Sequence, residues 1–195
     1  MIAALRDRDI LDDTIVVFTT DHGEMLGSHG LLLKGAVMCD ELIKIPLVIK
    51  PPKGYARART VDRLTSTVDI VPTLLEVSGV GVPGGLDGVS FAPILQGQDA
   101  PERAGVISEF HSNNWTDRVI PLRMWRTKRW KYVEATNSGS ELYDLQTDPW
   151  EKRNLVGDSN YDSQRETLKA DLYQQMRSSG DRFPDVPLPP VVPIK

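Results

Sequence analysis

Hydrophobic residues in the first part of the chain alternate between strand and helix patterns. Thr14–Thr20 is a short, continuous, β-branched run, which is typical of a central strand buried on both faces. Pro46–Lys50 has a second strand pattern, which two further prolines end. Ile70–Ser78 predicts a helix with an apolar stripe, and Asp69 is placed to cap its start. This order of elements predicts an α/β fold.

After about residue 100 the apolar runs become shorter and closer together. The runs with the length of strands are Gly105–Phe110, Leu122–Thr127, Trp130–Ala135 and Glu141–Leu145. The second and third fold back at Lys128 and Arg129, which predicts an antiparallel hairpin. Tyr161–Ser178 predicts an amphipathic C-terminal helix. We expect an α/β part over 1–100, a small α+β subdomain with an antiparallel sheet over 101–183, and a proline-rich tail over 184–195.

The composition limits the classes of protein. With 195 residues, of which 40% are hydrophobic and 26% charged, the chain can form one domain, or one large domain with an appendage. Its net charge of −4 lacks the basic surface of nucleic-acid-binding proteins, and we expect Arg123–Lys131 to be the solvent face of the hairpin. No apolar run approaches the roughly 20 residues of a membrane-spanning helix. Met1–Asp9 has no signal-peptide pattern, and the localisation stays open.

Candidate chemistry begins directly after the first predicted strand, at Asp21 and His22. In open α/β sheets, ligands bind beyond the carboxyl ends of strands. A carboxylate and an imidazole in one turn can together hold a divalent cation. Two ligands are too few for a complete site, so a polar turn with no ligand is the alternative from these residues alone.

The motifs that follow make a longer pattern. They are Asp21-His22, Gly23-Glu24, Gly27-Ser28-His29-Gly30, Lys34-Gly35, Glu41, Ile45-Pro46-Leu47, Asp69–Leu75, Leu86–Ser90, Arg126–Tyr132 and Glu141–Leu155. In this order they resemble the sulfatase family of the alkaline-phosphatase superfamily, from the second half of the catalytic domain to the C-terminal subdomain. The resemblance spans nearly residues 1–178. It implies part of a mixed or mostly parallel sheet flanked by helices, followed by the α+β subdomain and its C-terminal helix.

The resemblance also implies roles for single residues. Asp21 and His22 correspond to two metal ligands, usually of Ca²⁺, although a nitrogen ligand suits Mn²⁺ or Zn²⁺ better. Lys34 corresponds to the lysine that binds the sulfate oxygens of the substrate. His29 is a candidate catalytic residue, a hydrogen-bond partner of the substrate, or a turn residue. Glu41 either orients Lys34 or pairs at the surface.

Two further residues are expected to be structural. Glu24 belongs to the turn. Cys39 is the single cysteine, so no internal disulfide can form. Sulfatases use a cysteine, oxidised to formylglycine within Cys-x-Pro-x-Arg, as the nucleophile. Cys39 has no such surroundings, and we expect it to be a small buried residue.

The resemblance implies a metal-dependent hydrolase of small-molecule or sugar sulfate esters. A phosphonate monoesterase or phosphodiesterase of the same superfamily is the first alternative, and a non-catalytic fragment or gene remnant is the second. The family's nucleophile, its neighbouring arginine and an Asp-Asp metal pair find no counterpart in the sequence. We therefore expect the chain to need a missing N-terminal half, and to be inactive and poorly soluble by itself.

Overall fold

The computed structural model describes residues 1–55, 58–100, 102–113, 118–136, 139–181 and 183. The expected proline-rich tail over 184–195 lies outside them. The chain folds into two compact units: Met1–Asp21 with Ile45–Arg103, and His22–Lys44 with Ala104–Lys195. Residues 22–44, which the sequence grouped with the α/β part, thus pack in the second unit. The domain boundary near residue 100 stays a prediction.

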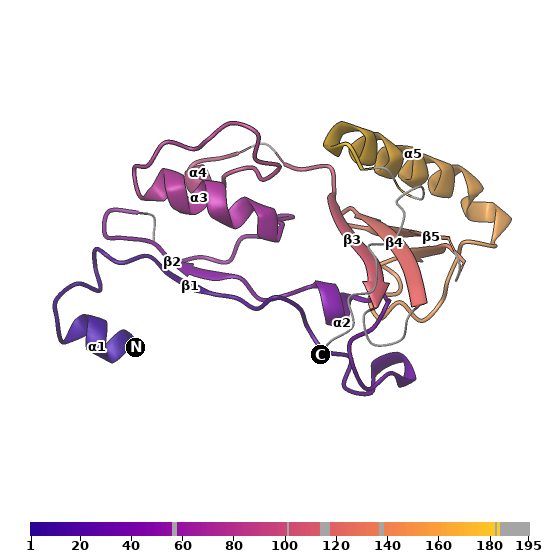
Figure 1. Ribbon diagram of the computed structural model, residues 1–195, viewed down its shortest axis with the longest axis horizontal. Coiled ribbons are helices and arrows are strands. Elements are labelled where there is room, and N and C mark those ends of the chain that lie inside the picture. Colours follow the sequence, from indigo (N-terminus) through magenta and orange to yellow (C-terminus); the bar gives the residue numbers. More distant parts are fainter. Residues whose placement is uncertain (56–57, 101, 114–117, 137–138, 182, 184–195) are drawn as a thin grey trace, which may run out of the picture. The chain divides into compact units, whose positions relative to one another are not determined.

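The first unit is an α/β arrangement. Its elements are α1 (Ile2–Arg6), β1 (Val16–Phe18), β2 (Val48–Lys50), a 3-10 turn (Thr67–Asp69), α3 (Ile70–Val77) and α4 (Ala92–Leu95) (Figure 1). β1 and β2 pair antiparallel, with Phe18 opposite Val48. The expectation that the first strand is buried on both faces is wrong within this chain, because Phe18 is 64% exposed. A two-stranded sheet is too narrow to bury both of its faces.

Asp69 fixes the start of α3 by a buried charge. Its carboxylate accepts hydrogen bonds from the backbone amides of Ser66 and Val89, both at 2.8 Å. Both guanidinium NH groups of Arg103 donate to the same carboxylate, at 2.9 and 2.8 Å. Asp69 lies where an N-cap was predicted, but its side chain bonds to these partners instead of to the amides of α3.

The second unit is the predicted α+β subdomain with residues 22–44 added. Its elements are a 3-10 turn (Ser28–Gly30), α2 (Asp40–Ile43), β3 (Val106–Asn113), β4 (Arg118–Arg126), β5 (Trp130–Ala135), β6 (Glu141–Asp144), a 3-10 turn (Ser159–Tyr161) and α5 (Asp162–Ser179). The strands form one sheet in the order β3-β4-β5-β6, antiparallel throughout. The predicted hairpin is the β4–β5 connection, and the predicted C-terminal helix is α5. Among the described residues, no helix combines the length and the apolar character needed to cross a membrane.

Both faces of this sheet are covered, because side chains alternate between the faces along each strand. One face packs against α5, which lies along the sheet (Figure 1). This core cluster consists of Trp125, Tyr132, Leu142, Leu155, Leu168, Leu172, Met176 and Phe183. The opposite face packs against Met38, which comes from residues 22–44. Its partners in the sheet are Leu122, Met124 and Val133.

The cationic run Arg123–Lys131 is not a solvent face, so that prediction is wrong. Arg123 is 4% exposed and Lys131 is fully buried. Strand alternation directs Arg123 to the α5 face, where its Nε lies 2.5 Å from Asp181 Oδ2. Lys131 lies on the opposite face, among carboxylates described below. The reason is that Arg123 and Lys131 each meet carboxylates distant in sequence, which compensate for the lost hydration. Lys128 and Arg129, where the hairpin folds back, are exposed as predicted.

A substitution at Leu172 tests the packing of α5 on the sheet. We expect Leu172→Ala to lower the free energy of unfolding of the complete protein by about 2–5 kcal/mol, because it leaves a cavity beneath a side chain with no exposed surface. Asp171→Ala, at the exposed neighbouring position, should change it by no more than about 0.5 kcal/mol. Urea unfolding followed by circular dichroism measures both. Equal losses in the two variants would contradict the described core.

Candidate functional site

The turn after β1 packs closely against α2. The Gly23 amide donates to the carbonyl of Leu42 at 2.7 Å. A Cβ atom at Gly23 would lie 1.9 Å from the carbonyl oxygen of Glu41, which no side chain could tolerate. Glycine is required at this position because a second backbone segment approaches it closely.

His22 and Lys34 lie side by side. Lys34 Nζ is 2.9 Å from His22 Nε2, and His22 Nδ1 is 2.6 Å from the carbonyl oxygen of Gly23. We assign the ring proton to Nδ1, because the carbonyl can only accept. Nε2 then accepts a hydrogen bond from the lysine ammonium through its one lone pair, and that lone pair could bind a cation only in place of this hydrogen bond. The structure thus brings together two of the residues singled out from the sequence.

Asp21, the other expected metal ligand, precedes His22 in the chain. Its Oδ1 accepts a hydrogen bond from Thr20 Oγ1 at 3.2 Å, and the residue is exposed. A carboxylate oxygen and an imidazole nitrogen suit a divalent cation such as Mn²⁺ or Zn²⁺, and Ca²⁺ if oxygen ligands complete the set. The chemistry of these two donors therefore fits the expected metal, and their role stays a prediction.

A second group of possible ligands lies within residues 22–44. His29 Nε2 is 3.7 Å from Glu41 Oε2, and with Cys39 Sγ these atoms lie within 4.8 Å of one another. His29 holds a left-handed backbone conformation, with φ of 53°. Glu41 pairs with His29 in this arrangement, while Lys34 contacts His22. Such a cluster could hold a metal ion, and the sequence analysis did not group the three residues.

Cys39 is not suited to be a nucleophile. Burial, together with the negative charges of Glu151 and Glu141, raises the pKa of its thiol to about 12. The thiol is therefore protonated at neutral pH, whereas attack requires the thiolate. Cys39 was expected to be a small buried residue, and in the structure it is partly buried. Glu24 accepts a hydrogen bond from the Met25 amide at 2.9 Å, as a turn residue can.

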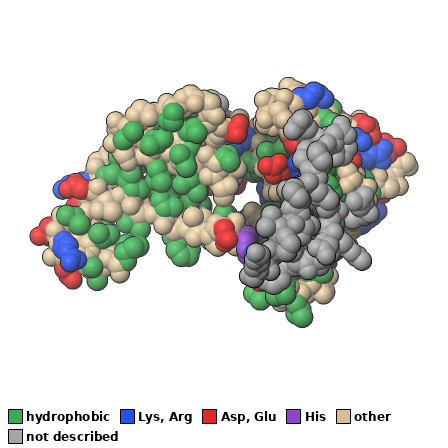
Figure 2. Space-filling view, in the orientation of Figure 1, with side chains coloured by type: hydrophobic (Ala, Val, Ile, Leu, Met, Phe, Trp, Pro, Cys, Tyr) green, Lys and Arg blue, Asp and Glu red, His purple; other side chains and the backbone are tan. Residues whose placement is uncertain are grey.

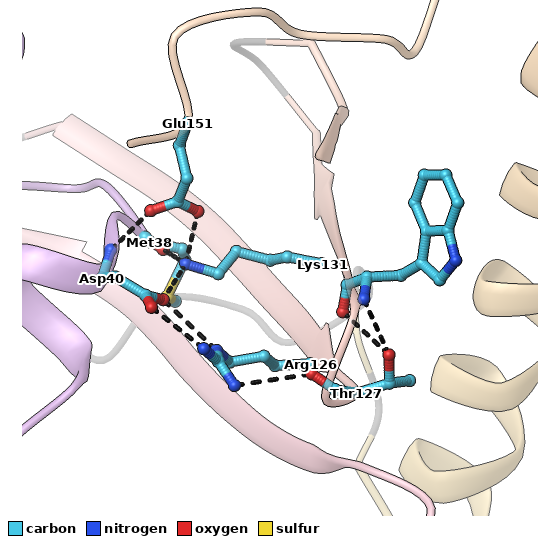
Figure 3. Close-up of polar contacts among 7 residues, drawn as sticks. Met38, Asp40, Arg126, Thr127, Lys131 and Glu151 are labelled. Carbon is cyan, nitrogen blue, oxygen red and sulfur yellow. Dashed lines mark hydrogen bonds and ion pairs between the residues drawn. The ribbon is translucent and has the colours of Figure 1, made fainter. Parts of the chain in front are cut away.

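A buried cluster of charged residues fixes the start of α2 (Figure 3). Lys131 Nζ lies 2.9 Å from the carbonyl oxygen of Met38, 2.5 Å from Asp40 Oδ1 and 2.5 Å from Glu151 Oε1. Arg126 donates to both carboxylate oxygens of Asp40, at 3.3 and 3.0 Å. Burial raises the pKa of Asp40, but hydrogen bonds from Arg126 and the charge of Lys131 outweigh it, so the pKa lies below its ordinary value.

Sequence reasoning missed this cluster, although a signal was present. Alternation along the predicted strand Trp130–Ala135 places Lys131 on the same face as Val133, which is apolar and buried. A lysine on a buried face needs carboxylate partners. The partners themselves could not be predicted, because Asp40 lies 91 residues away in the sequence.

Comparisons with known proteins identify the family of this chain. A family model described as "N-sulphoglucosamine sulphohydrolase, C-terminal" matches residues 27–178. A curated relative, the Δ4,5-hexuronate-2-O-sulfatase of Bacteroides thetaiotaomicron, is 36% identical over 153 residues, which are 76% of this chain and 32% of the relative. The chain spans about a third of the length of such relatives.

Solved structures give the same result for the fold. The structure of a 2-O GAG sulfatase matches with a TM-score of 0.89 and 32% identity, over 95% of this chain and 41% of that one. A phosphonate monoester hydrolase of Agrobacterium radiobacter matches with a TM-score of 0.80 and 31% identity, over 91% of this chain and 38% of that one.

A substitution at Gly23 tests the contact between the turn and α2. We expect Gly23→Ala to lower the free energy of unfolding by about 1–3 kcal/mol, because the added methyl group must displace the backbone of α2. Gly35→Ala is the matched control, since a Cβ atom at Gly35 meets nothing within 4 Å. Urea unfolding of the two variants in the complete protein measures the difference. Equal stability of the two variants would contradict the contact.

Proposed function

Because this chain belongs to the sulfatase family, as the C-terminal portion of its members, we propose that the complete protein hydrolyses sulfate esters. The observation that carries this proposal is the position of Lys34, whose ammonium lies 2.9 Å from the ring of His22. The resemblance assigns sulfate binding to Lys34 and metal binding to His22. Both residues would act on the same sulfate group, so their side chains should lie close together. Their proximity supports the assignment.

Lys34 would act through its charge. In hydrolysis of a sulfate ester, negative charge builds up on the sulfuryl oxygens and on the departing alkoxide oxygen. An ammonium already held beside the site stabilises that charge without having to reorganise. The lysine is exposed and donates to His22, so it lies within reach of an incoming anion. We propose that Lys34 binds the sulfate group of the substrate.

Asp21 and His22 would hold a divalent cation, through the carboxylate and through Nε2. Such a cation, when bound, supplies positive charge that polarises the ester oxygens. The Gly23 carbonyl would keep Nδ1 protonated and leave Nε2 as the coordinating atom, and a cation bound there would displace the Lys34 ammonium from Nε2 toward the substrate. Ca²⁺ is the expected ion by family, and Mn²⁺ or Zn²⁺ is the alternative. His29 is proposed as a further residue of this site, where its imidazole could contact the substrate or exchange a proton.

We propose sulfated sugars as the substrate class. The curated relative described above is named for a hexuronate 2-O-sulfate, and the matching solved structure for a 2-O GAG sulfate. A phosphonate or phosphate ester is the second candidate. The similarity to a phosphonate monoester hydrolase favours it, as does an imidazole ligand, which suits Mn²⁺ and Zn²⁺.

The experiment is to assay the complete protein on aryl sulfate, on sulfated sugars and on aryl phosphonate esters, with the bound metal measured. We expect turnover of the sulfates to exceed that of the phosphonate. Lys34→Ala should lower kcat/KM on aryl sulfate by roughly 10²-fold or more, because a charge directed at the developing anion is lost. Asp21→Ala should abolish activity and reduce the bound metal.

A control variant separates the site from its surroundings. Lys44→Ala removes an exposed lysine of the same segment and should keep activity within a few-fold of the unchanged protein. Near-normal turnover in Lys34→Ala or Asp21→Ala would defeat the assignment. Faster turnover of the phosphonate would favour the second candidate, and no turnover of any ester would favour a non-catalytic protein.

The first unit carries apolar side chains at its surface (Figure 2). Phe18 and Val48 are cross-strand partners in the β1–β2 pair, and they are 64% and 61% exposed. An apolar groove of about 480 Å³ lies in the same unit, with Leu47, Ile49, Phe91, Ile94 and Leu95 among its lining residues. We propose that further parts of the complete protein cover these side chains, since the curated relatives are about three times as long.

This proposal predicts opposite effects in two contexts. Phe18→Ser with Val48→Ser should raise the soluble, monomeric fraction of the 195-residue chain, because exposed apolar surface is removed. The same pair should lower the melting temperature of the complete protein, where the side chains would be buried. Gel filtration and thermal unfolding measure the two effects, with Val82→Ser as an exposed apolar control outside the pair. Unchanged melting of the complete protein would contradict the proposed covering.

A further inference from the structure

The ammonium of Lys131 is enclosed by oxygens from two separate segments. The carbonyl of Met38 and the carboxylate of Asp40 come from residues 22–44, and the carboxylate of Glu151 comes from the turn after β6 (Figure 3). With no exposed surface, the lysine has these oxygens in place of water. Its charge therefore depends on residues 38–40 staying in place.

The other charges in the cluster reinforce this geometry. Glu151 Oε2 accepts the backbone amide of Asp40 at 2.7 Å, while its Oε1 faces Lys131. Arg126 holds Asp40 from the neighbouring strand through both guanidinium NH contacts. Two cations and two carboxylates balance, so no uncompensated charge is left. Glu151 has a φ of 52°, which an L residue rarely adopts. Such a backbone conformation persists only where surrounding contacts hold it, so we attribute it to the partners of Glu151.

A continuous set of contacts leads from this cluster to the candidate site. Asp40 is the first residue of α2, and the carbonyl of Leu42 in the same helix accepts the Gly23 amide at 2.7 Å. The Gly23 carbonyl contacts His22 Nδ1, and His22 Nε2 contacts Lys34. These hydrogen bonds lie within the second unit and are joined through the backbone of α2 and of Gly23. A shift of α2 would therefore move the imidazole and its lysine partner.

We propose that Lys131 is a positioning residue for the site, acting through Asp40 and α2 on His22 and Lys34. This inference rests on the proposed function for its catalytic consequence, but its structural part stands independently. The C-terminal sheet would then do more than support the fold, because a buried cation of β5 sets the place of the residues that bind metal and sulfate. A change at Lys131 should affect the site without touching the substrate.

Hydrogen exchange read by mass spectrometry tests the structural part in the complete protein. Lys131→Met keeps the volume and removes the charge, and Asp40→Asn keeps the shape as a milder variant in case the first does not fold. Both should raise amide exchange in peptides covering residues 22–44 by about tenfold or more, with α5 unchanged. Lys169→Met is the matched control: it removes a lysine of α5 whose side chain is 41% exposed and which pairs with Glu134 of β5, and it should leave exchange in residues 22–44 unchanged.

Kinetics on the aryl sulfate test the catalytic part. Lys131→Met and Asp40→Asn should lower kcat by about tenfold or more, because misplaced groups stabilise the transition state poorly. Unchanged exchange in 22–44, or an equal rise in α5, would overturn the positioning role, and so would local exchange with unchanged kcat. If the complete protein turns over no ester, the proposed function fails by itself, and the exchange measurement still decides whether Lys131 holds the segment.

Discussion

The second unit is organised around one constraint, which is that a charged lysine side chain is buried and has no exposed surface. Lys131 lies on an inner strand of a four-stranded sheet, with its side chain directed to the face opposite α5. Apolar cover alone would leave the charge unsolvated, at a cost of several kcal/mol. Residues 38–40 supply both the apolar cover, through Met38, and the compensating oxygens, through Asp40 and a carbonyl. Residues 38–40 must therefore lie in this one position, both to compensate the charge of Lys131 and to complete the apolar core.

Apolar contact and ion pairing make different contributions to this arrangement. Met38 could slide over Leu122, Met124 and Val133 with little loss, because hydrophobic contact has no direction. The carboxylate of Asp40 cannot slide, because Arg126 and Lys131 approach it from fixed positions on adjacent strands. Buried ion pairs are weak evidence for stability, since an apolar replacement can be as stable. Their effect here is better described as specificity, in that they select one register of residues 22–44 on the sheet.

The sequence predicted the regular elements well and the burial of charges poorly. The strands of the second unit and α5 follow from periods of two and 3.6, which depend on nearby residues only. Arg123–Lys131 was expected at the surface because charged runs usually are solvated. That expectation failed, because the burial of Lys131 depends on Asp40 and Glu151, which are distant in sequence and follow no short pattern. The proximity of Lys34 to His22 followed from the family resemblance, whereas the pairing of His29 with Glu41 needed coordinates.

The electrostatics around Cys39 define what this chain can contribute to a reaction. Burial and the carboxylates of Glu151, Glu141 and Glu41 all keep the thiol protonated, although the nearby Lys131 acts in the opposite direction. A protonated thiol does not attack an ester, so the one cysteine of the chain is unsuited to bond formation. The residues proposed for the site are a carboxylate, imidazoles and an ammonium, groups whose chemistry is to bind ions and to stabilise charge. Under the proposed function, the contribution of these residues to the reaction is therefore electrostatic.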